Sequence, residues 1–267
     1  MTFLGPITNP DNSTLKYVRS LRDKRRARYQ EKRYLIEGLR LTAHALQRGH
    51  RPALAFYSSD LVAVPEGKAL LDALDATSSL LWSLSPQLLA SIAATVTPQG
   101  IVVVMPMPEP DLQAARRASL ALVLDRLRDP GNMGTMLRTA HAAGMEAAVL
   151  SPGCVDPYSP KVVRAGMGAH LDLPVLVGLS WAEIASLMQG KQCILADTLG
   201  EATVWEIDWR RPSALIIGSE AHGPGPEARA LADHVARLPM AEGAESLNAA
   251  IAMAVFAFEA YRQRHAL

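Results

Sequence analysis

Three short segments in the second half of the chain combine glycines with polar side chains that could bind and activate a polar substrate. The first carries Asn132 and Arg138, the second carries Glu220 between two glycines, and the third is Ser-Leu-Asn at residues 246–248. A guanidinium can clamp a phosphate or stabilise a developing alkoxide, and glycines let a ligand approach the backbone closely. Ligands of open α/β sheets bind beyond the carboxyl ends of the strands, where we expect all three segments. The segments therefore predict one polar ligand site.

Common glycine-loop sites do not fit these segments. Gly166 and Gly168 are not followed by the third glycine of a dinucleotide-binding fingerprint. Residues 218–223 have the glycine spacing of a phosphate-binding P-loop, but Pro224 stands where that loop needs a lysine. The G-x-x-G pattern at residues 131–134 is typical of an RNA-binding loop, but it is too short to be specific.

Apolar runs that alternate with helical patterns are the elements expected to position the polar segments. In the second half we expect strands at residues 120–124, 147–150, 174–177, 192–196, 214–217 and 235–238. Helices are expected there at residues 133–143 and 247–264. In the first half we expect strands at residues 34–38, 54–58, 80–84 and 100–105. This alternation is typical of an α/β fold.

A change in composition divides the chain of 267 residues. Residues 106–111 contain three prolines, which neither a helix nor a central strand accommodates. We therefore predict a first domain at residues 1–105, a linker at residues 106–117 and a second domain at residues 118–267. The second domain holds all three polar segments.

The net charge of +1 conceals a strong asymmetry along the chain. Residues 1–51 carry 12 of the 27 lysines and arginines but only 4 of the 26 acidic residues. Within this stretch, the pattern of residues 12–29 predicts one helix with a thin apolar stripe. The cations on its other faces either form a solvated basic face or contact nucleic-acid phosphates. The candidate phosphate contacts are Arg22, Lys24, Arg25, Arg26 and Arg28.

Composition argues against a membrane or secreted protein. No apolar run reaches the roughly 18 residues that a membrane span requires. The N-terminal residues lack the basic and apolar stretches of a signal peptide, so we expect a cytoplasmic, reduced protein. Cys154 and Cys193 are then expected to be buried, and the spacing of His141, His170 and His222 indicates no metal site.

The order and spacing of the polar segments resemble those of the SpoU (TrmH-like) branch of the SPOUT RNA methyltransferases. The family motifs N-x-G-x-x-x-R-T-A, G-x-E-x-x-G and S-L-N correspond here to residues 132–140, 218–223 and 246–248. A further stretch, Asp-Pro-Tyr-Ser-Pro-Lys at residues 156–161, lies between the first two motifs. The first domain, with Leu-Ile-Glu-Gly at residues 35–38 after the basic helix, resembles the L30e-like substrate-binding domain of rRNA-modifying members.

This resemblance implies a ribose 2′-O-methyltransferase that acts on structured RNA and uses S-adenosylmethionine. It implies a second domain that is a parallel α/β sheet with a deep trefoil knot, after a smaller α/β L30e-like domain. Two subunits build each active site in the family, so we expect a homodimer through the second domain. The expected partner is RNA, with large-subunit (23S) ribosomal RNA favoured by the first domain. We expect neither a membrane nor a metal as a partner.

The resemblance also implies roles for individual residues. Catalytic roles are implied for Arg138, Asn132, Glu220, Ser246 and Asn248. Cofactor contacts are implied for Ile217, Gly218, Glu220, Leu238, Met240, Ser246, Leu247 and Asn248. Arg138 and the five cations of the basic helix are the expected RNA contacts. Asn132 and Ser246 could instead cap helices.

Other interpretations stay open at this point. Arg138 is either a general base or, because arginine stays protonated at neutral pH, a clamp for a phosphate or a developing alkoxide. The substrate could be tRNA rather than rRNA, and the protein could be a non-catalytic RNA-binding protein on the same fold. A nucleotide-binding oxidoreductase is disfavoured because the glycine fingerprint is missing.

Overall fold

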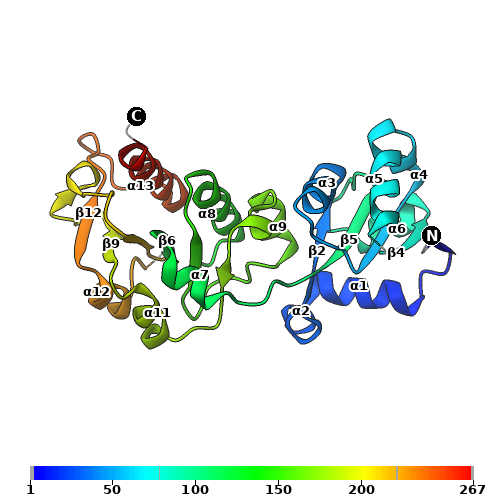
Figure 1. The fold of residues 1–267 in the computed structure, drawn as a ribbon, viewed down its shortest axis with the longest axis horizontal. Helices are drawn as coiled ribbons and strands as arrows, with labels where there is room; N and C mark the ends of the chain where they lie inside the picture. The colour runs from blue at the N-terminus through cyan, green and yellow to red at the C-terminus, as the bar shows by residue number, and fades with distance from the viewer. Residues whose placement is uncertain (1–2, 78, 221, 266–267) are drawn as a thin grey trace. The chain divides into compact units, whose positions relative to one another are not determined.

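The computed structural model describes residues 3–77, 79–220 and 222–265. The chain divides into two compact α/β units (Figure 1). The first unit comprises Met1–Pro108 and Tyr158–Leu171, and the second comprises Glu109–Pro157 and Asp172–Leu267. The α/β class expected from the sequence is confirmed.

The first unit contains a five-stranded mixed sheet. Its strands lie in the order β1 (Phe3–Ile7), β4 (Leu80–Leu84), β3 (Leu54–Tyr57), β5 (Ile101–Pro106) and β2 (Arg33–Glu37). β5 runs antiparallel to β3 and β2, and the other pairs are parallel. Alternate residues of β5 point to opposite faces, so Val103 joins one hydrophobic core while Val102 and Val104 join the other. The helices before β5 are α1 (Ser13–Asp23), α2 (Arg25–Glu31), α3 (Leu39–Gln47), α4 (Ser59–Val62), α5 (Pro65–Ala76) and α6 (Pro86–Ile92).

A later stretch of the chain, Tyr158–Leu171, completes the first unit. It carries α9 (Pro160–Gly166) and the start of α10 (Ala169–Asp172). The ring of Tyr158 lies 5.1 Å from that of Tyr34, and both belong to the same hydrophobic core. This stretch lies within the predicted second domain, so the boundary at residues 118–267 differs from the division in the structure. The difference arises because the apolar side chains of the stretch fill the core of the first unit.

The connection between the two units is shorter than the predicted linker at residues 106–117. Pro106 is the last residue of β5, and α7 (Leu112–Arg117) is a helix. The Asp111 side chain caps α7 by accepting a hydrogen bond from the backbone of Ala114 at 2.8 Å. Ala115 is buried in the core of the second unit, which explains why the helix forms directly after the prolines.

The second unit contains a seven-stranded sheet in which all paired strands are parallel. Its strands lie in the order β10 (Ala202–Thr203), β12 (His234–Arg237), β9 (Gln192–Ala196), β11 (Ser213–Ile217), β6 (Leu120–Leu124), β7 (Ala147–Leu150) and β8 (Val175–Leu176). The six strands expected from the sequence are all present. This parallel sheet is the architecture that the family resemblance implies, and the trefoil knot stays a prediction.

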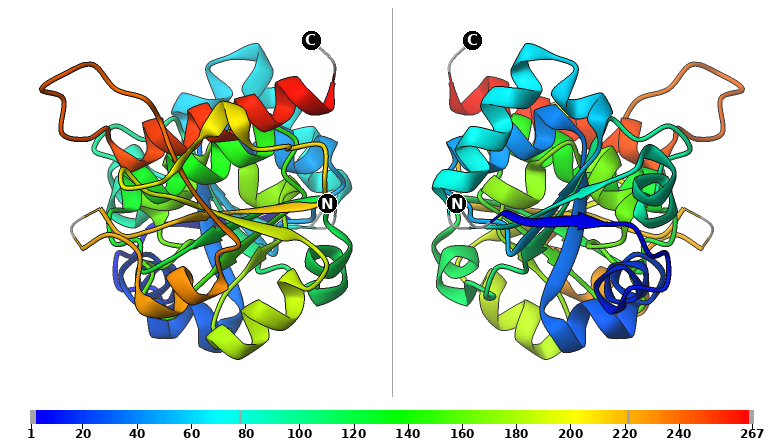
Figure 2. Two further views of the ribbon diagram at one scale, coloured as in Figure 1. Left: turned by 90° about the vertical axis from the view of Figure 1, so that its left-hand side faces the viewer. Right: turned by 90° about the vertical axis from the view of Figure 1, so that its right-hand side faces the viewer.

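Helices cover both faces of the second sheet. α8 (Pro130–Ala142) and α13 (Ala249–Arg264) lie side by side over one face, and α11 (Trp181–Met188) and α12 (Pro226–Leu231) lie over the other (Figure 2). Every residue of the central strands β6 and β11 is therefore buried. A short 3-10 turn, Val204–Glu206, follows β10. The loop between β12 and α13 projects from the unit (Figure 2).

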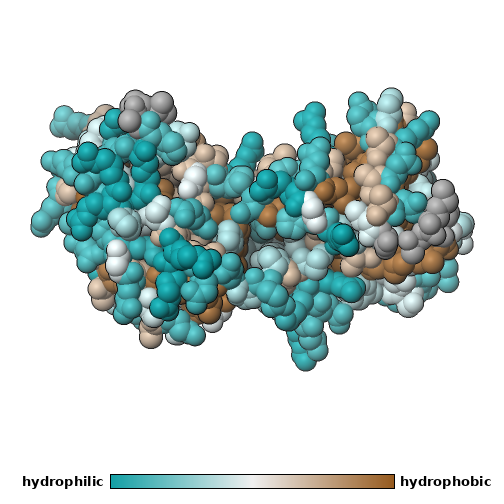
Figure 3. Space-filling view, viewed as in Figure 1, coloured by the Kyte–Doolittle hydropathy of each residue, from teal (hydrophilic) through white to brown (hydrophobic). Residues whose placement is uncertain are grey.

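The two cysteines are buried free thiols, as predicted. Burial raises the pKa of Cys193 to about 11. On the face shown in Figure 3, hydrophilic side chains predominate, with smaller hydrophobic patches between them. No helix among the described residues is long and apolar enough to cross a membrane.

Candidate active site

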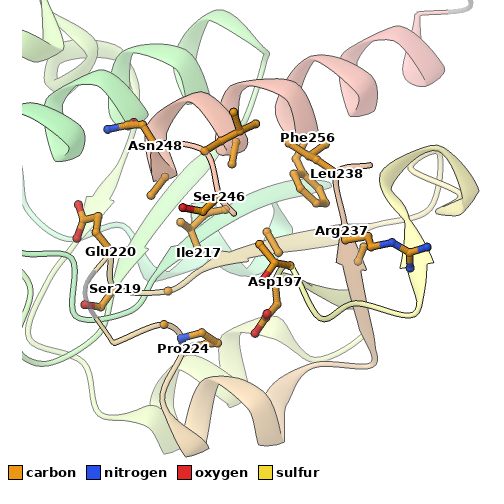
Figure 4. A pocket seen from close by; sticks show the side chains of 18 of the residues that line it. Asp197, Ile217, Ser219, Glu220, Pro224, Arg237, Leu238, Ser246, Asn248 and Phe256 are labelled. Carbon is orange, nitrogen blue, oxygen red and sulfur yellow. The ribbon is translucent and has the colours of Figure 1, made fainter. Parts of the chain in front are cut away.

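A cavity of about 570 Å³ lies in the second unit, at the carboxyl ends of its central strands (Figure 4). Its volume lies within the range of about 300–1,000 Å³ that is typical of small-molecule sites. Most of the residues that line it end or follow β9, β11 and β12 or lie at the start of α8 or α13. All eight predicted cofactor contacts line it: Ile217, Gly218, Glu220, Leu238, Met240, Ser246, Leu247 and Asn248.

Asn132 reaches the cavity from the first turn of α8. This helix begins where Pro130 occupies the first turn and the Asp129 side chain accepts a hydrogen bond from the backbone of Asn132 at 2.7 Å. Asp129 is thus the helix cap, so the alternative that Asn132 is the cap is wrong. The Asn132 side chain is left available to contact other segments.

A chain of hydrogen bonds joins the three polar segments. The Asn248 Nδ2 donates to Asn132 Oδ1 at 3.1 Å, and Asn132 Nδ2 donates to Glu220 Oε1 at 2.8 Å. Asn248 also caps α13, because its Oδ1 accepts from the backbone of Ala250 at 2.9 Å. The predicted convergence of the three segments is therefore observed.

The groups at the two ends of this series of hydrogen bonds determine which atom donates and which accepts in each of them. Backbone N–H groups at the start of α13 can only donate, so Asn248 must turn its oxygen toward them and its amino group toward Asn132. The oxygen of Asn132 then accepts, and its amino group donates to Glu220. An ionised carboxylate can only accept, which suits Glu220 at the far end. Asparagine at both middle positions supplies the required donor and acceptor pair.

Apolar side chains form another part of the wall. Ile217 ends β11, Leu238 follows β12, and Phe256 lies on the inner face of α13. Figure 4 shows Glu220 and Asn248 at one end of the cavity and Arg237 at the other. The cavity therefore combines an apolar wall with a polar end that carries a carboxylate.

Three charged residues of the cavity were missed by the sequence analysis: Asp197, Arg229 and Arg237. Arg229 Nη2 lies 2.7 Å from the carboxylate of Asp197, whose side chain is only 8% exposed. Arg237 Nη1 donates to the backbone oxygen of Glu201 at 2.6 Å and so holds the loop after β9. Asp197 directly follows β9, so the rule that ligands bind beyond strand ends could have indicated it.

Ser246 lines the cavity but does not cap a helix. The cap of α13 is Asn248, so the alternative that Ser246 serves as an N-cap is wrong. Residues 241–248 are all exposed and form most of the projecting loop. The Ser246 hydroxyl has no hydrogen-bond partner among the described residues.

Comparison with known proteins identifies the family. The profile of the SpoU rRNA Methylase family matches residues 119–258, which include the whole cavity. The chain belongs to this family. The profile of the MRM3-like substrate binding domain matches residues 12–103 of the first unit. The resemblance inferred from the three motifs is therefore confirmed, and the chain is an RNA methyltransferase.

Individual family members match over nearly the full chain. An uncharacterized tRNA/rRNA methyltransferase of Synechocystis is 38% identical, covering 98% of this chain and 96% of that protein. The 23S rRNA (uridine(2479)-2′-O)-methyltransferase of Streptomyces viridochromogenes is 28% identical, covering 95% of this chain and 91% of that protein. The AdoMet-bound rRNA methyltransferase of Sinorhizobium meliloti aligns with a TM-score of 0.87 at 29% identity, covering 100% of both chains.

The family arginine, Arg138, does not line the cavity. It lies six residues after Asn132, on an exposed face of α8. Its guanidinium has no hydrogen-bond or ion-pair partner among the described residues. The structure therefore brings together four of the five predicted catalytic residues and leaves Arg138 outside them.

The basic stretch is two helices rather than the single predicted one. α1 and α2 meet at Lys24, whose backbone is extended. Arg28 is buried and donates to the backbone oxygens of Leu21 at 2.6 Å and Arg22 at 2.9 Å, which are the last carbonyls of α1. The prediction that Arg28 contacts RNA is therefore wrong, because its guanidinium caps α1.

Arg22 also has intramolecular partners. It donates to the backbone oxygens of Ser91 at 2.8 Å and Ala93 at 3.1 Å, and it pairs with Asp23. The hydrogen bond from Arg22 lowers the pKa of the Asp23 carboxyl. These contacts anchor α1 to the C-terminal end of α6.

Lys24, Arg25 and Arg26 are exposed where α1 meets α2. The Arg25 guanidinium lies 5.2 Å from the ring centre of Tyr29, a cation–π distance. Of the five predicted cations of the basic stretch, these three remain candidates for contacts with RNA phosphates. No group of three His, Cys, Asp or Glu side chains in the described part of the chain is placed to hold a metal ion.

Proposed function

We propose that this protein transfers the methyl group of S-adenosylmethionine to a ribose 2′-hydroxyl of ribosomal RNA. The observation that carries the proposal is the convergence of all three family motifs on one cavity, linked by the chain from Asn248 through Asn132 to Glu220. A relative named as a 23S rRNA 2′-O-methyltransferase supports ribose as the target and large-subunit RNA as the substrate. A relative named for both tRNA and rRNA keeps tRNA as the alternative substrate.

The cavity suits S-adenosylmethionine in both size and chemistry. Its apolar wall of Ile217, Leu238 and Phe256 can cover an adenine ring. Gly218 lines the cavity beside this wall, where main-chain groups can bond to the edge of the ring. The carboxylate of Glu220 can oppose the positive charge of a sulfonium. An AdoMet-bound relative of the same fold supports this assignment.

The protein's part in the reaction is mainly to bind and position. When bound, S-adenosylmethionine supplies a methyl group on a positively charged sulfur, ready for attack by an oxygen. Asn132 and Asn248 hold Glu220 in place, and the shape of the cavity can hold the methyl group in line with an incoming hydroxyl. Arg138 would either accept the proton of that hydroxyl or, remaining charged, stabilise the forming alkoxide or clamp a phosphate.

We further infer a homodimer in which a second copy of the chain supplies Arg138 to each cavity. Arg138 is exposed and outside the cavity of its own chain, which favours a shared site. Ile251, Val255 and Phe258 form an exposed apolar stripe on α13. They lie on the opposite side of the helix from the buried Met253 and Ala257. Apolar side chains in a continuous exposed row are typical of a subunit interface.

Two further points from the sequence concern the alternative function and the location of the protein. An intact motif set and a cavity of cofactor size argue against a non-catalytic RNA-binding protein. The cytoplasmic location stays a prediction from the sequence.

Calorimetry with S-adenosylmethionine tests the cofactor assignment. We expect one molecule to bind per chain. Ala252→Phe, which places a ring in the cavity, should weaken binding at least about tenfold. Ala254→Phe is the matched control, because this residue lies on the same helix but does not line the cavity. Absence of binding by the folded wild-type protein would overturn the proposed function.

A further inference from the structure

One buried residue contacts the loop of the second motif at both of its ends. Asp125 directly follows β6 and is 1% exposed. Its backbone N–H donates to the Ile217 oxygen at 2.8 Å, just before the loop at residues 218–224. Its Oδ2 accepts from the Gly225 N–H at 2.7 Å, just after the loop. The same residue therefore fixes where this loop leaves the sheet and where it joins α12.

The loop between these two anchors has little freedom at its base. A Cβ atom on Gly218 would lie 2.4 Å from the backbone nitrogen of Pro224. The first and last residues of the loop are therefore in close backbone contact. Gly223 donates to the Ser219 oxygen at 2.9 Å, which closes the loop above this point. The loop carries Glu220 and lines the cavity. Its position at the base therefore determines where Glu220 meets Asn132.

The second carboxylate oxygen of Asp125 extends the anchor to a third strand. Asp125 Oδ1 accepts from the Ser151 hydroxyl at 2.9 Å, and Ser151 directly follows β7. The hydroxyl oxygen in turn accepts from the Arg126 N–H at 3.0 Å. Arg126 adopts a φ of 50°, a conformation that residues other than glycine rarely adopt. The backbone and carboxylate of Asp125 together thus join the ends of β6, β7 and β11 at one buried point.

Asp125 does not line the cavity, so it can influence a ligand only through the loop. We propose that Asp125 is a positioning residue for cofactor binding, which holds the described parts of the loop, residues 218–220 and 222–224, in the positions that S-adenosylmethionine requires. The inference rests on the proposed function. Asp125 positions the loop through its hydrogen bond with Gly225. The Ser151 contact fixes only the end of β7.

The test compares three variants of the full-length protein by calorimetry with S-adenosylmethionine. Asp125→Ala removes the hydrogen bonds to Gly225 and Ser151 and the ion pair with Arg126 at 3.4 Å, and it should raise the Kd at least about tenfold. Asp125→Asn loses the ion pair with Arg126 but should restore most of the affinity, because the amide oxygen can still accept from Gly225 while the amino group donates to the Ser151 hydroxyl. Ser151→Ala is the matched control, which loses the Ser151 hydrogen bonds to Asp125 and Arg126 but keeps the Gly225 contact, and it should change the Kd less than about threefold.

Kinetics separate positioning from general damage to the fold. In Asp125→Ala the KM for S-adenosylmethionine should rise, while kcat at saturating cofactor and the KM for RNA stay near their wild-type values. An unchanged Kd in Asp125→Ala would overturn the inference, as would equal losses in Asp125→Ala and Ser151→Ala or a failure of Asp125→Asn to restore binding. If wild-type protein does not bind the cofactor, the proposed function fails instead.

Amide hydrogen exchange on the wild-type protein covers the case in which Asp125→Ala does not fold. Saturating S-adenosylmethionine should slow exchange in the peptide that contains Gly225, because the cofactor selects the anchored loop. Rapid exchange of this amide in the saturated protein would overturn the inference.

Discussion

Asn132 donates a hydrogen bond to the Glu220 carboxylate at 2.8 Å, and the two residues are 88 positions apart in the sequence. This contact joins the first turn of α8, which follows β6, to the loop after β11, and β6 and β11 are neighbours in the sheet. Asn248 adds the start of α13 to the same chain of hydrogen bonds. The shape of the candidate active site therefore depends on two amides whose orientations are fixed from both ends.

The first prediction concerns the donor at Asn132. Asn132→Ala should lower kcat/KM roughly tenfold, because Glu220 and Asn248 each lose a partner. Asn132→Asp should lower it further, although the side chain has the same shape, because a carboxylate would face the Glu220 carboxylate. Steady-state methyl-transfer assays provide the comparison. An Asp variant as active as wild type would show that the direction of this hydrogen bond is irrelevant.

The second prediction concerns the source of Arg138. Arg138→Ala should reduce methyl transfer at least about a hundredfold while leaving cofactor affinity near wild type. Glu220→Ala should also be inactive, because it removes the cavity carboxylate that opposes the sulfonium. Co-expression of the two variants tests whether one site uses residues of two chains.

In such a mixture, half of the dimers are mixed, and each mixed dimer has one intact site if Arg138 comes from the other chain. The mixture should therefore regain about one quarter of the wild-type activity. If Arg138 serves the cavity of its own chain, the mixture will stay as inactive as either variant alone.

The third prediction concerns the exposed cations at the junction of α1 and α2. Replacing Lys24, Arg25 and Arg26 by glutamine should weaken RNA binding and flatten its dependence on salt, by up to about 0.7–0.9 in slope for each lost phosphate contact. The control replaces Arg116, Arg117 and Arg210 of the second unit, which changes the net charge equally. Equal salt slopes for the two triple variants would show that these three cations form a solvated face and do not contact RNA phosphates.

The fourth prediction separates Arg28 from its basic neighbours. Arg28→Met should lower the free energy of unfolding by about 1–3 kcal/mol, because the last carbonyls of α1 lose a buried donor. Arg26→Met, at an exposed position of the same helix, should change it by less than about 0.5 kcal/mol. Urea denaturation measures both. Similar stabilities of the two variants would contradict the capping role.

The sequence alone was informative where function depends on local pattern. Apolar runs of about five residues are long enough to indicate buried strands. Each motif follows such a run or begins a helix. The convergence of Asn132, Glu220 and Asn248 could therefore be predicted. The positions of six of the seven strands in the second unit followed from the same pattern, and the two-residue β10 was missed because it is too short to form an apolar run.

Long-range packing explains what the sequence could not show. Arg28 has the same side chain as the exposed arginines beside it, and only the turn between α1 and α2 brings it to the carbonyls of α1. The Asp125 anchor depends on β11 pairing with β6, which places Gly225 beside a residue 100 positions earlier. The stretch Tyr158–Leu171 begins within the motif at residues 156–161, yet its apolar side chains complete the core of the first unit.

The most direct test of the account is the chemical identity of the methylated product. Ribosomal RNA from cells that lack this gene would be incubated with the purified protein and S-adenosylmethionine labelled in its methyl group, then digested to nucleosides. We predict that the label elutes with one 2′-O-methylated nucleoside from the large-subunit RNA. Label in a methylated base, or no label transferred by protein that binds the cofactor, would contradict the proposed ribose 2′-O-methyltransferase.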